Sequence, residues 1–507
     1  MGCAPPRHHP GILIVGREGD AVKLDPADIT DGESAQVTEN IFDTLVAYRN
    51  SSTQIKPDLA LSWSRSKNGE VWIFHLRHHV RFQDGTKFNA ASVVFNFDQW
   101  MNPKDPYHKY GKFIYWQTIW GGFPGKIRKV QAIGKHTVKF TLSQPVAPFL
   151  KNLAMFCFAI SSPTAVKKWK ENYFKHPVGT GPFKLVLWQR NERIVLDRNP
   201  YYWGKKPSIK RLIFVPIKDS TTRMLELERG DIDFMTGVNV EEVKILKKDP
   251  NIRVLAEPGM NIAYLAMNCE KPPFNQTAVR QAVRYAINIE KIVKELYEGL
   301  AIPAVNPIPP MILGYNPRLK KFHYNPKKAK RLLTKAGFSH GFSTTLWYPP
   351  ISRQYIPDPK AVAEAMQADL RKVGIKVKLV TYDWGSYLYK TEMGEHSMAI
   401  LGWIGDNGDP DDFLYALLDK TNAVKPAQNI AFYTNEKVHR LLLKAQRIFN
   451  PEKRKILYQK AIRIINQDSP WVPIAYADQI VAFNKKVKGF HLNPTGMLRF
   501  QNVKENP

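Results

Sequence analysis

Residues 402–411 read Gly402-Trp403-Ile404-Gly405-Asp406-Asn407-Gly408-Asp409-Pro410-Asp411. The middle of this run consists of Asp, Asn, Gly and Pro, which favour tight turns because their backbones or short polar side chains suit turn geometry. Taken alone, Asp406 is therefore most simply a turn residue. The rest of the chain decides whether it has a second role.

Helix-like and strand-like segments alternate upstream of this run. A helix is predicted from Asp358-Pro359 to Gly374, because apolar residues recur every four positions between them. In residues 375–379 apolar side chains alternate with Lys376 and Lys378, which predicts a half-buried strand with a charged, wet face. This stretch is a βα-type alternation.

The same alternation extends through the remaining chain. Val71–Leu76 and Thr137–Leu142 are predicted as strands because they are rich in β-branched and aromatic residues. Helices are predicted over Ala90–Met101, over 279–297, and from Asn325-Pro326 to Gly337. The fold class is therefore mixed α/β, and the length of 507 residues predicts about three domains.

The chain is strongly basic, with 74 Lys plus Arg against 45 Asp plus Glu and a formal net charge of +29. Such a field attracts anions, so both a solvated surface and a binder of nucleic acid or anionic membranes are consistent with it. Many lysines, Lys376 and Lys378 among them, fall on the wet faces of amphipathic segments. A nucleic-acid site would instead gather them on one surface with aromatic platforms, so the dispersion favours the solvated surface.

Several classes of protein are excluded by what the sequence lacks. The longest apolar run, residues 153–160, is far shorter than the roughly 20 residues of a membrane helix. Three cysteines cannot form a disulfide scaffold, and Cys157 and Cys269 are predicted to be structural thiols. No metal-binding or catalytic motif is present, so no enzyme, no metal site and no cofactor is predicted.

The segment Gly2-Cys3-Ala4-Pro5-Pro6 resembles the cleavage point of a bacterial lipoprotein signal. Cys3 is then the residue that would carry the lipid. Whether it is the stub of a removed signal or a coincidence stays open.

Taken together, several segments resemble the extracytoplasmic solute-binding proteins of bacterial peptide ABC importers. Each match alone is weak, but their common order and spacing extend from about residue 40 to the C-terminus. The matching segments are Ile55-Lys56-Pro57-Asp58-Leu59-Ala60, Ser62-Trp63, Phe74-His75-Leu76-Arg77, Asp84-Gly85, Phe88-Asn89-Ala90-Ala91-Ser92-Val93-Val94-Phe95, Gly179-Thr180-Gly181-Pro182-Phe183, Arg280-Gln281-Ala282 and Pro307-Ile308-Pro309-Pro310. The dipeptide-binding subgroup is suggested by Asn102-Pro103, Pro106-Tyr107-His108, Thr381-Tyr382-Asp383-Trp384-Gly385 and, above all, residues 402–411.

The resemblance implies a two-lobed, hinged periplasmic binding protein fold of type II, similar to cluster C, with an extra subdomain. It assigns residues 10–47, 177–258 and 477–507 to a discontinuous domain I. Residues 48–176 form the extra subdomain, domain II. Residues 259–476 form the second ligand-binding lobe, domain III.

The resemblance also implies two charged anchors for a peptide. In dipeptide-binding members, an Arg in an Arg-x-Tyr-x-Pro segment holds the peptide carboxylate, and the first Asp of a Gly-Asp-Asn-Gly-Asp-Pro-Asp segment holds the ammonium. Arg353 and Asp406 match these positions. Such anchors suit a buried zwitterion, because an unpaired buried charge is costly. Outside the family context, Arg353 would be assigned to a surface ion pair.

Further residues are predicted to line the ligand site. Tyr355, Trp384, Gly402 and Trp403 belong to it, since rigid aromatic walls accept varied side chains; core packing is the alternative, above all for Trp384. Relatives carry a Thr-Thr-Tyr-like loop where this chain reads Asp31-Gly32-Glu33-Ser34. Glu33 and Ser34 are predicted at the ligand, where Glu33 would favour cationic ligands.

The function implied is that of a non-enzymatic, cofactor-free receptor. It captures dipeptides or short peptides between its lobes and delivers them to an inner-membrane ABC permease with separate ATPase subunits. The resemblance implies a periplasmic or extracytoplasmic monomer, lipid-anchored if Cys3 is modified, with no nucleic-acid partner. Peripheral membrane contact, which the positive charge would allow, stays open. Two alternatives stay open: haem or glutathione binding by the same fold, and, from another class, a basic nucleic-acid or anionic-membrane-surface binder.

Overall fold

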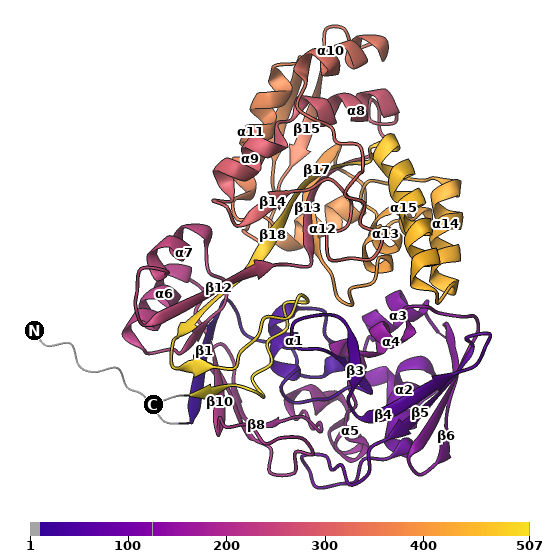
Figure 1. Ribbon diagram of the computed structural model, residues 1–507, viewed down its shortest axis with the longest axis vertical. Helices are drawn as coiled ribbons and strands as arrows, with labels where there is room; N and C mark the ends of the chain where they lie inside the picture. The colour runs from indigo at the N-terminus through magenta and orange to yellow at the C-terminus, as the bar shows by residue number, and fades with distance from the viewer. Residues whose placement is uncertain (1–10, 124, 506–507) are drawn as a thin grey trace, which may run out of the picture. The chain divides into compact units, whose positions relative to one another are not determined.

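The computed structural model describes residues 11–123 and 125–505 and divides into two units (Figure 1). Of the described residues, unit 1 contains 11–123, 125–256 and 480–505, and unit 2 contains 257–479. The chain passes from one unit to the other within β12 (Ile252–Pro258) and within β18 (Trp471–Asn484). Unit 1 is therefore assembled from two separate stretches of sequence.

A mixed sheet forms the centre of unit 1. Its strand order is β11-β1-β10-β9-β8, with the last residues of β18 beside β11. β1 pairs in parallel with β10 and β11, whereas β9 pairs antiparallel with both β10 and β8. The elements are β1 (Ile12–Arg17), β8 (Phe183–Gln189), β9 (Arg193–Arg198), β10 (Arg211–Pro216), β11 (Phe234–Met235), α1 (Gly32–Thr38), α6 (Ser220–Arg229) and α7 (Val240–Leu246). Leu13, Val15 and Phe214 are among the residues that fill its core.

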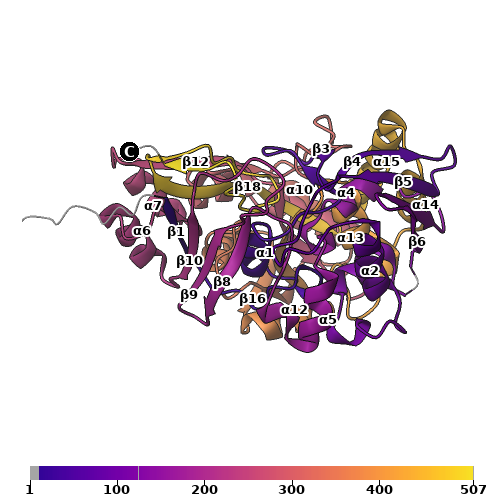
Figure 2. The ribbon, with the colours of Figure 1, turned by 90° about the horizontal axis from the view of Figure 1, so that it is seen from below.

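An antiparallel sheet of order β4-β5-β7-β6 forms a second part of unit 1 (Figure 2). Aromatic rings pack between it and the adjacent helices; the ring centroids of Phe97 and Phe140 are 4.9 Å apart and those of Phe74 and Phe140 are 5.3 Å apart. The elements are β4 (Ala60–Arg65), β5 (Val71–Leu76), β6 (Ile127–Gly134), β7 (Thr137–Leu142), α2 (Ala90–Met101), α3 (Ile114–Trp120), α4 (Phe149–Leu153) and α5 (Pro163–Trp169). The predicted bounds of β5, β7 and α2 are confirmed. Two small sheets complete the unit, β2 (Val46–Tyr48) with β3 (Ile55–Pro57), and β19 (Val487–Lys488) with β20 (Lys504–Glu505).

Unit 2 is a sheet covered by helices on both faces. Its order is β16-β15-β17-β13-β18, and β14 pairs with β18. In β13, Leu265 and Met267 belong to one apolar core and Tyr264 and Ala266 to the other, because successive side chains of a strand point to opposite faces. The strands are β13 (Asn261–Met267), β14 (Ala301–Pro303), β15 (Phe342–Trp347), β16 (Ile375–Val380) and β17 (Met398–Ile404).

Two sets of helices cover these two faces (Figure 1). The first core takes residues from α8 (Thr277–Ala286), α9 (Ile289–Leu296), α10 (Pro326–Lys335) and α11 (Pro359–Arg371). The second core takes residues from α12 (Trp384–Glu392), α13 (Asp411–Leu418), α14 (Glu436–Arg447) and α15 (Pro451–Asp468). A sheet covered on both faces explains why β13 is buried along its whole length and apolar from Ile262 to Met267, apart from the Tyr264 hydroxyl.

Most of the predicted elements of unit 2 are confirmed, and one is wrong. α10 and α11 begin at the predicted prolines, and Gly337 and Gly374 follow their ends with φ of +90° and +88°. Residues 279–297, predicted as one helix, form α8 and α9 instead. Ile287 is extended between them, and Asn288 caps α9 by accepting a hydrogen bond from the Lys291 N–H at 3.1 Å. The apolar period continues across this break because both helices face the same core.

Among the described residues, no helix combines the length and apolar character needed to cross a membrane. Cys157 is buried, as predicted, and Cys269 is a half-buried free thiol whose pKa burial raises to about 11. Cys3 lies outside the described residues.

Candidate functional site

The turn at residues 402–411 connects the end of β17 to the start of α13, and a buried ion pair holds it. Both carboxylate oxygens of Asp409 accept hydrogen bonds from the Arg454 guanidinium of α15, at 2.9 and 2.8 Å. The Tyr458 hydroxyl donates to Asp411 at 2.8 Å. Asp409 is 1% exposed and Arg454 6%. This turn is therefore fixed by paired charges, and its second Asp has a structural role.

Asp406 is half-buried at the start of the same turn, where it meets a second carboxylate. Its backbone N–H donates to Asp412 at 2.6 Å, and the Trp403 indole N–H donates to the other oxygen of Asp412 at 3.3 Å. Burial, followed by the negative charge of Asp406, raises the pKa of Asp412 well above its ordinary value. Asp412 thus links Trp403 to Asp406. Sequence reasoning missed this residue, whose only signal is an acidic first turn of α13.

Arg353 lies in a tight turn whose backbone is closed by two hydrogen bonds between Arg353 and Ile356. Its guanidinium carbon is 4.1 Å from the centroid of the Trp384 ring, a cation–π contact. The Arg353 Nε is buried and has no hydrogen-bond partner within the described part of the chain. The Arg353 guanidinium is therefore held in place by Trp384, and its Nε–H has no acceptor among the described residues.

Tyr355 packs against the backbone of Gly402. A Cβ added to Gly402 would lie 2.3 Å from Tyr355 Cδ2, so only glycine allows the ring to approach this closely. Tyr355 is buried, and burial raises the pKa of its hydroxyl to about 12. The Tyr297 hydroxyl donates to the Tyr355 carbonyl at 3.1 Å and anchors the segment from α9's side of the sheet.

These contacts all lie in unit 2, and we call the set Arg353, Tyr355, Trp384, Gly402, Trp403 and Asp406 the aromatic site. The structure joins Arg353 to Trp384, Tyr355 to Gly402, and Trp403 to Asp406 through Asp412. Trp384 also stacks on Tyr387, with the ring planes 9° apart, so it packs on the core while its ring faces Arg353.

The two predicted site residues of unit 1 lie at the start of α1. The Ser34 hydroxyl is fully buried and accepts hydrogen bonds from the backbone N–H groups of Val22 and Lys23, at 2.8 and 3.3 Å. Glu33 is half-buried, and its carbonyl accepts from buried Arg17 at 2.6 Å. Ser34 thus fastens a loop to α1. A ligand role for either residue stays a prediction.

No group of three or more His, Cys, Asp or Glu side chains in residues 11–123 and 125–505 is arranged to hold a metal ion.

Comparisons with known proteins identify the family. Residues 54–425 match the family described as bacterial extracellular solute-binding proteins, family 5, middle part. The chain belongs to this family. It is 36% identical over 505 residues to the dipeptide-binding protein of Escherichia coli K12, which covers 97% of this chain and 94% of that protein. It is also 36% identical over 490 residues to heme-binding protein A of Haemophilus influenzae, covering 94% and 89% of the two chains.

Solved structures of family members have the same fold. The periplasmic binding protein DppA of Helicobacter pylori, in complex with the peptide STSA, superposes with a TM-score of 0.86 at 41% identity and covers 97% of this chain and 98% of its own. The dipeptide-binding protein of Pseudoalteromonas, in complex with Met-Leu, gives 0.88 at 31% identity, covering 98% and 100%. The predicted family and the predicted mixed α/β periplasmic binding protein fold are confirmed.

Proposed function

We propose that this protein captures dipeptides or short peptides with free ends and delivers them to the permease of an ABC importer. In this proposal Arg353 binds the peptide carboxylate and Asp406 the ammonium, while Tyr355, Trp384, Gly402 and Trp403 form walls around the side chains. Glu33 and Ser34 contribute from unit 1.

The state of Arg353 carries the proposal. Its guanidinium is held on Trp384, its buried Nε has no partner in the described residues, and no ion pair with a described carboxylate is present. A buried donor without an acceptor is unfavourable. The planar guanidinium of Arg can also donate two parallel hydrogen bonds to a carboxylate, which no other cationic side chain does. A peptide carboxylate would satisfy it.

The carboxylates at the other end of the aromatic site support binding of a cation. Asp406 and Asp412 lie next to each other, and their mutual repulsion contributes to the raised pKa of Asp412. An ammonium group placed there would relieve this repulsion. A ligand with one anionic and one cationic end matches both groups of residues.

The proposal includes the finer organisation expected from the family. Residues 10–47, 177–258 and 477–507 form domain I, 48–176 domain II and 259–476 domain III, and peptide binding favours closure of the lobes. The protein acts as a periplasmic monomer without altering its ligand, and Cys3 is a lipid-attachment site. Hydrolysis of a bound peptide, detected by mass spectrometry, would contradict the non-enzymatic role.

Isothermal titration calorimetry with end-blocked peptides tests the two anchors. We expect Met-Leu to bind, and N-acetyl-Met-Leu and Met-Leu amide each to lose about 2 kcal/mol or more, a factor of about 30. Asp406→Asn should remove the discrimination against the acetylated form alone, and Arg353→Met the discrimination against the amide alone. Equal affinities for free and blocked forms in the wild-type protein would refute the anchors.

Haem and glutathione form the second arm of this experiment, since heme-binding protein A and glutathione-binding proteins are relatives at 36% and 32% identity. Tighter binding of either than of Met-Leu or Ser-Thr-Ser-Ala would replace peptides as the proposed ligand while leaving the family assignment intact.

A further inference from the structure

A second pocket lies in unit 2, where α8, α10, α15 and the segment 316–322 meet. It encloses about 310 Å³, at the lower end of the range of small-molecule sites. Four basic side chains line it: Arg318, Lys320, Lys328 and Arg463. Within the described chain, no Asp or Glu does. We call it the basic pocket; it shares no residue with the aromatic site.

The four cations that line the basic pocket are not neutralised by any carboxylate in the described chain. Lys328 donates to the Tyr285 hydroxyl at 2.8 Å and Arg463 to the Gln459 carbonyl at 3.3 Å, and none of the four has an ion pair with a described carboxylate. Asp468, next to the lining residue Gln467, is already occupied by the Tyr433 hydroxyl at 2.6 Å and Asn435 at 2.8 Å. The positive charge of the pocket is therefore uncompensated.

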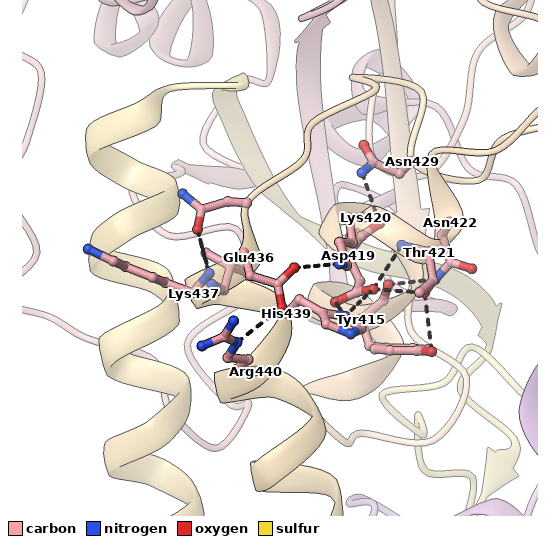
Figure 3. Close-up of polar contacts among 12 residues, drawn as sticks. Tyr415, Asp419, Lys420, Thr421, Asn422, Asn429, Glu436, Lys437, His439 and Arg440 are labelled. Atoms are coloured by element: carbon pink, nitrogen blue, oxygen red, sulfur yellow. Dashed lines mark hydrogen bonds and ion pairs between the residues drawn. The ribbon is translucent and has the colours of Figure 1, made fainter.

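The neighbouring helix α14 shows the opposite arrangement. Figure 3 shows Glu436 between Lys420 and Arg440, and it forms ion pairs with both; the Glu436–Arg440 distance is 3.1 Å. In the same view Asp419 accepts from His439 at 2.9 Å. Basic residues around α14 thus have acidic partners close by, whereas the four that line the basic pocket share one cavity without a described carboxylate.

A fifth cation lies behind the lining. Arg284 is 6% exposed; its guanidinium carbon is 3.8 Å from the centroid of the Phe322 ring, and its NH1 donates to the Asn466 side chain at 2.8 Å. Phe322 and Asn466 both line the pocket. Burial lowers the pKa of Arg284 to about 9, and no described carboxylate pairs with it. A buried charge without a counter-charge is costly, and an anion in the pocket would supply one.

The pocket is also built before any ligand enters. Lys328 lies 4.1 Å from the Tyr285 ring centroid, and the Tyr285 and Phe322 rings are 4.8 Å apart. The Asn466 amide donates to the Lys320 carbonyl at 3.0 Å, which ties the loop to α15. These contacts hold two aromatic faces beside the four charges, and preorganisation lowers the entropic cost of binding.

We propose that the basic pocket binds a ligand that carries a multiply charged phosphate group, with its non-phosphate part against Phe322. A phosphate monoester carries about −1.5 to −2 charges at pH 7, whereas one carboxylate carries a single charge. Its oxygens also match the fork of Arg318 or Arg463. The same chemistry is offered by a soluble phosphate monoester and by the monoester headgroup of phosphatidic acid.

Calorimetry on the full chain tests this site with pyrophosphate, glycerol 3-phosphate and citrate. We expect both phosphates to bind, and Lys320→Gln with Lys328→Gln to weaken them at least tenfold. The matched control, Lys376→Gln with Lys378→Gln, removes two exposed lysine charges from β16 and should leave the affinities unchanged. Met-Leu binding should be the same in all three proteins. If the pocket variant does not fold, Arg318→Gln with Arg463→Gln, two exposed positions, replaces it.

Co-sedimentation with vesicles distinguishes a lipid headgroup from a soluble phosphate compound as the ligand. If the protein binds phosphatidic acid–phosphatidylcholine vesicles, and the pocket variant loses this binding while the control keeps it, the ligand is a lipid headgroup. Binding of the free phosphates alone indicates a soluble ligand. The proposal is overturned if neither probe binds, if the control loses as much affinity as the pocket variant, or if citrate binds as tightly as pyrophosphate.

Discussion

The aromatic site and the basic pocket both place an arginine on an aromatic ring, but their surroundings differ. Arg353 lies 4.1 Å from the Trp384 centroid and Arg284 3.8 Å from that of Phe322. The aromatic site also contains the carboxylate of Asp406, with that of Asp412 beside it, whereas no described carboxylate lines the basic pocket. The same cation–π contact therefore occurs in two different electrostatic surroundings. Those of the aromatic site suit a zwitterion, and those of the basic pocket suit a polyanion.

The comparison also shows two uses of charge within one unit. The turn that carries Asp406 depends on the paired, buried charges of Asp409 and Arg454, while the basic pocket gathers charges that have no partner. Paired charges hold structure in place, and unpaired ones remain available for a ligand. The net charge of +29 does not distinguish these uses, because it counts both alike.

Breaking the paired charges should produce the largest effect. Arg454→Met leaves Asp409 buried without its partner, so we expect the free energy of unfolding to fall by about 3–5 kcal/mol in urea titrations. The double variant Asp409→Leu with Arg454→Met should recover most of this loss, since neither charge remains. Lys320→Gln with Lys328→Gln should cost little stability. A loss below about 1 kcal/mol for Arg454→Met would show that the pair does not hold the turn.

Changing the packing of the aromatic site should have a smaller effect. In Gly402→Ala the new Cβ would lie 2.3 Å from the Tyr355 ring, so the ring must move, at a cost of about 1–3 kcal/mol. Met-Leu affinity should fall with it, while pyrophosphate affinity stays unchanged. Gly385→Ala is the control: its Cβ meets nothing closer than Asp383 Oδ1 at 3.6 Å, and it lies in helix α12. Unchanged peptide affinity in Gly402→Ala would remove Tyr355 from the site.

The smallest expected effect is a change of folding stability with pH. It also shows over which pH range the protein is stable enough for the two sites to be compared. His396 is fully buried; its Nε2–H donates to the Ile430 carbonyl at 2.9 Å, and its Nδ1 has no partner in the described residues. Burial lowers its pKa from 6.5 to about 4. Between these values the unfolded chain binds more protons, so stability falls as pH drops from 6.5 to 4, by at most about 1.4 kcal/mol per pH unit.

Denaturant titrations at pH 7, 6 and 5 measure this slope. His396→Gln, whose amide can still donate to Ile430, should flatten it, and His340→Gln, at an exposed position, should leave it unchanged. The same slope in all three proteins would assign acid sensitivity to other groups.

Local sequence patterns predicted much of the fold and part of the aromatic site. β5, β7 and α2 lie at their predicted bounds because each depends on neighbouring residues: alternation in the strands and the Asn89 cap in the helix. The break between α8 and α9 was missed, since both helices face one core and their apolar period does not change. The positioning role of Asp412 was missed as well, because its bonds to Trp403 and Asp406 exist only once the turn has formed.

By itself, the sequence determined the family, the mixed α/β class and the candidate anchors Arg353 and Asp406, because these depend on the order of short motifs along the chain. Only the tertiary structure decided which charges are paired. Asp409 forms an ion pair with Arg454, 45 residues further along the chain. By contrast, one pocket without a described carboxylate brings together basic residues from separate parts of the sequence: Arg284, Arg318, Lys328 and Arg463. Electrostatic energy depends on distance and burial, and neither can be read from the order of residues alone.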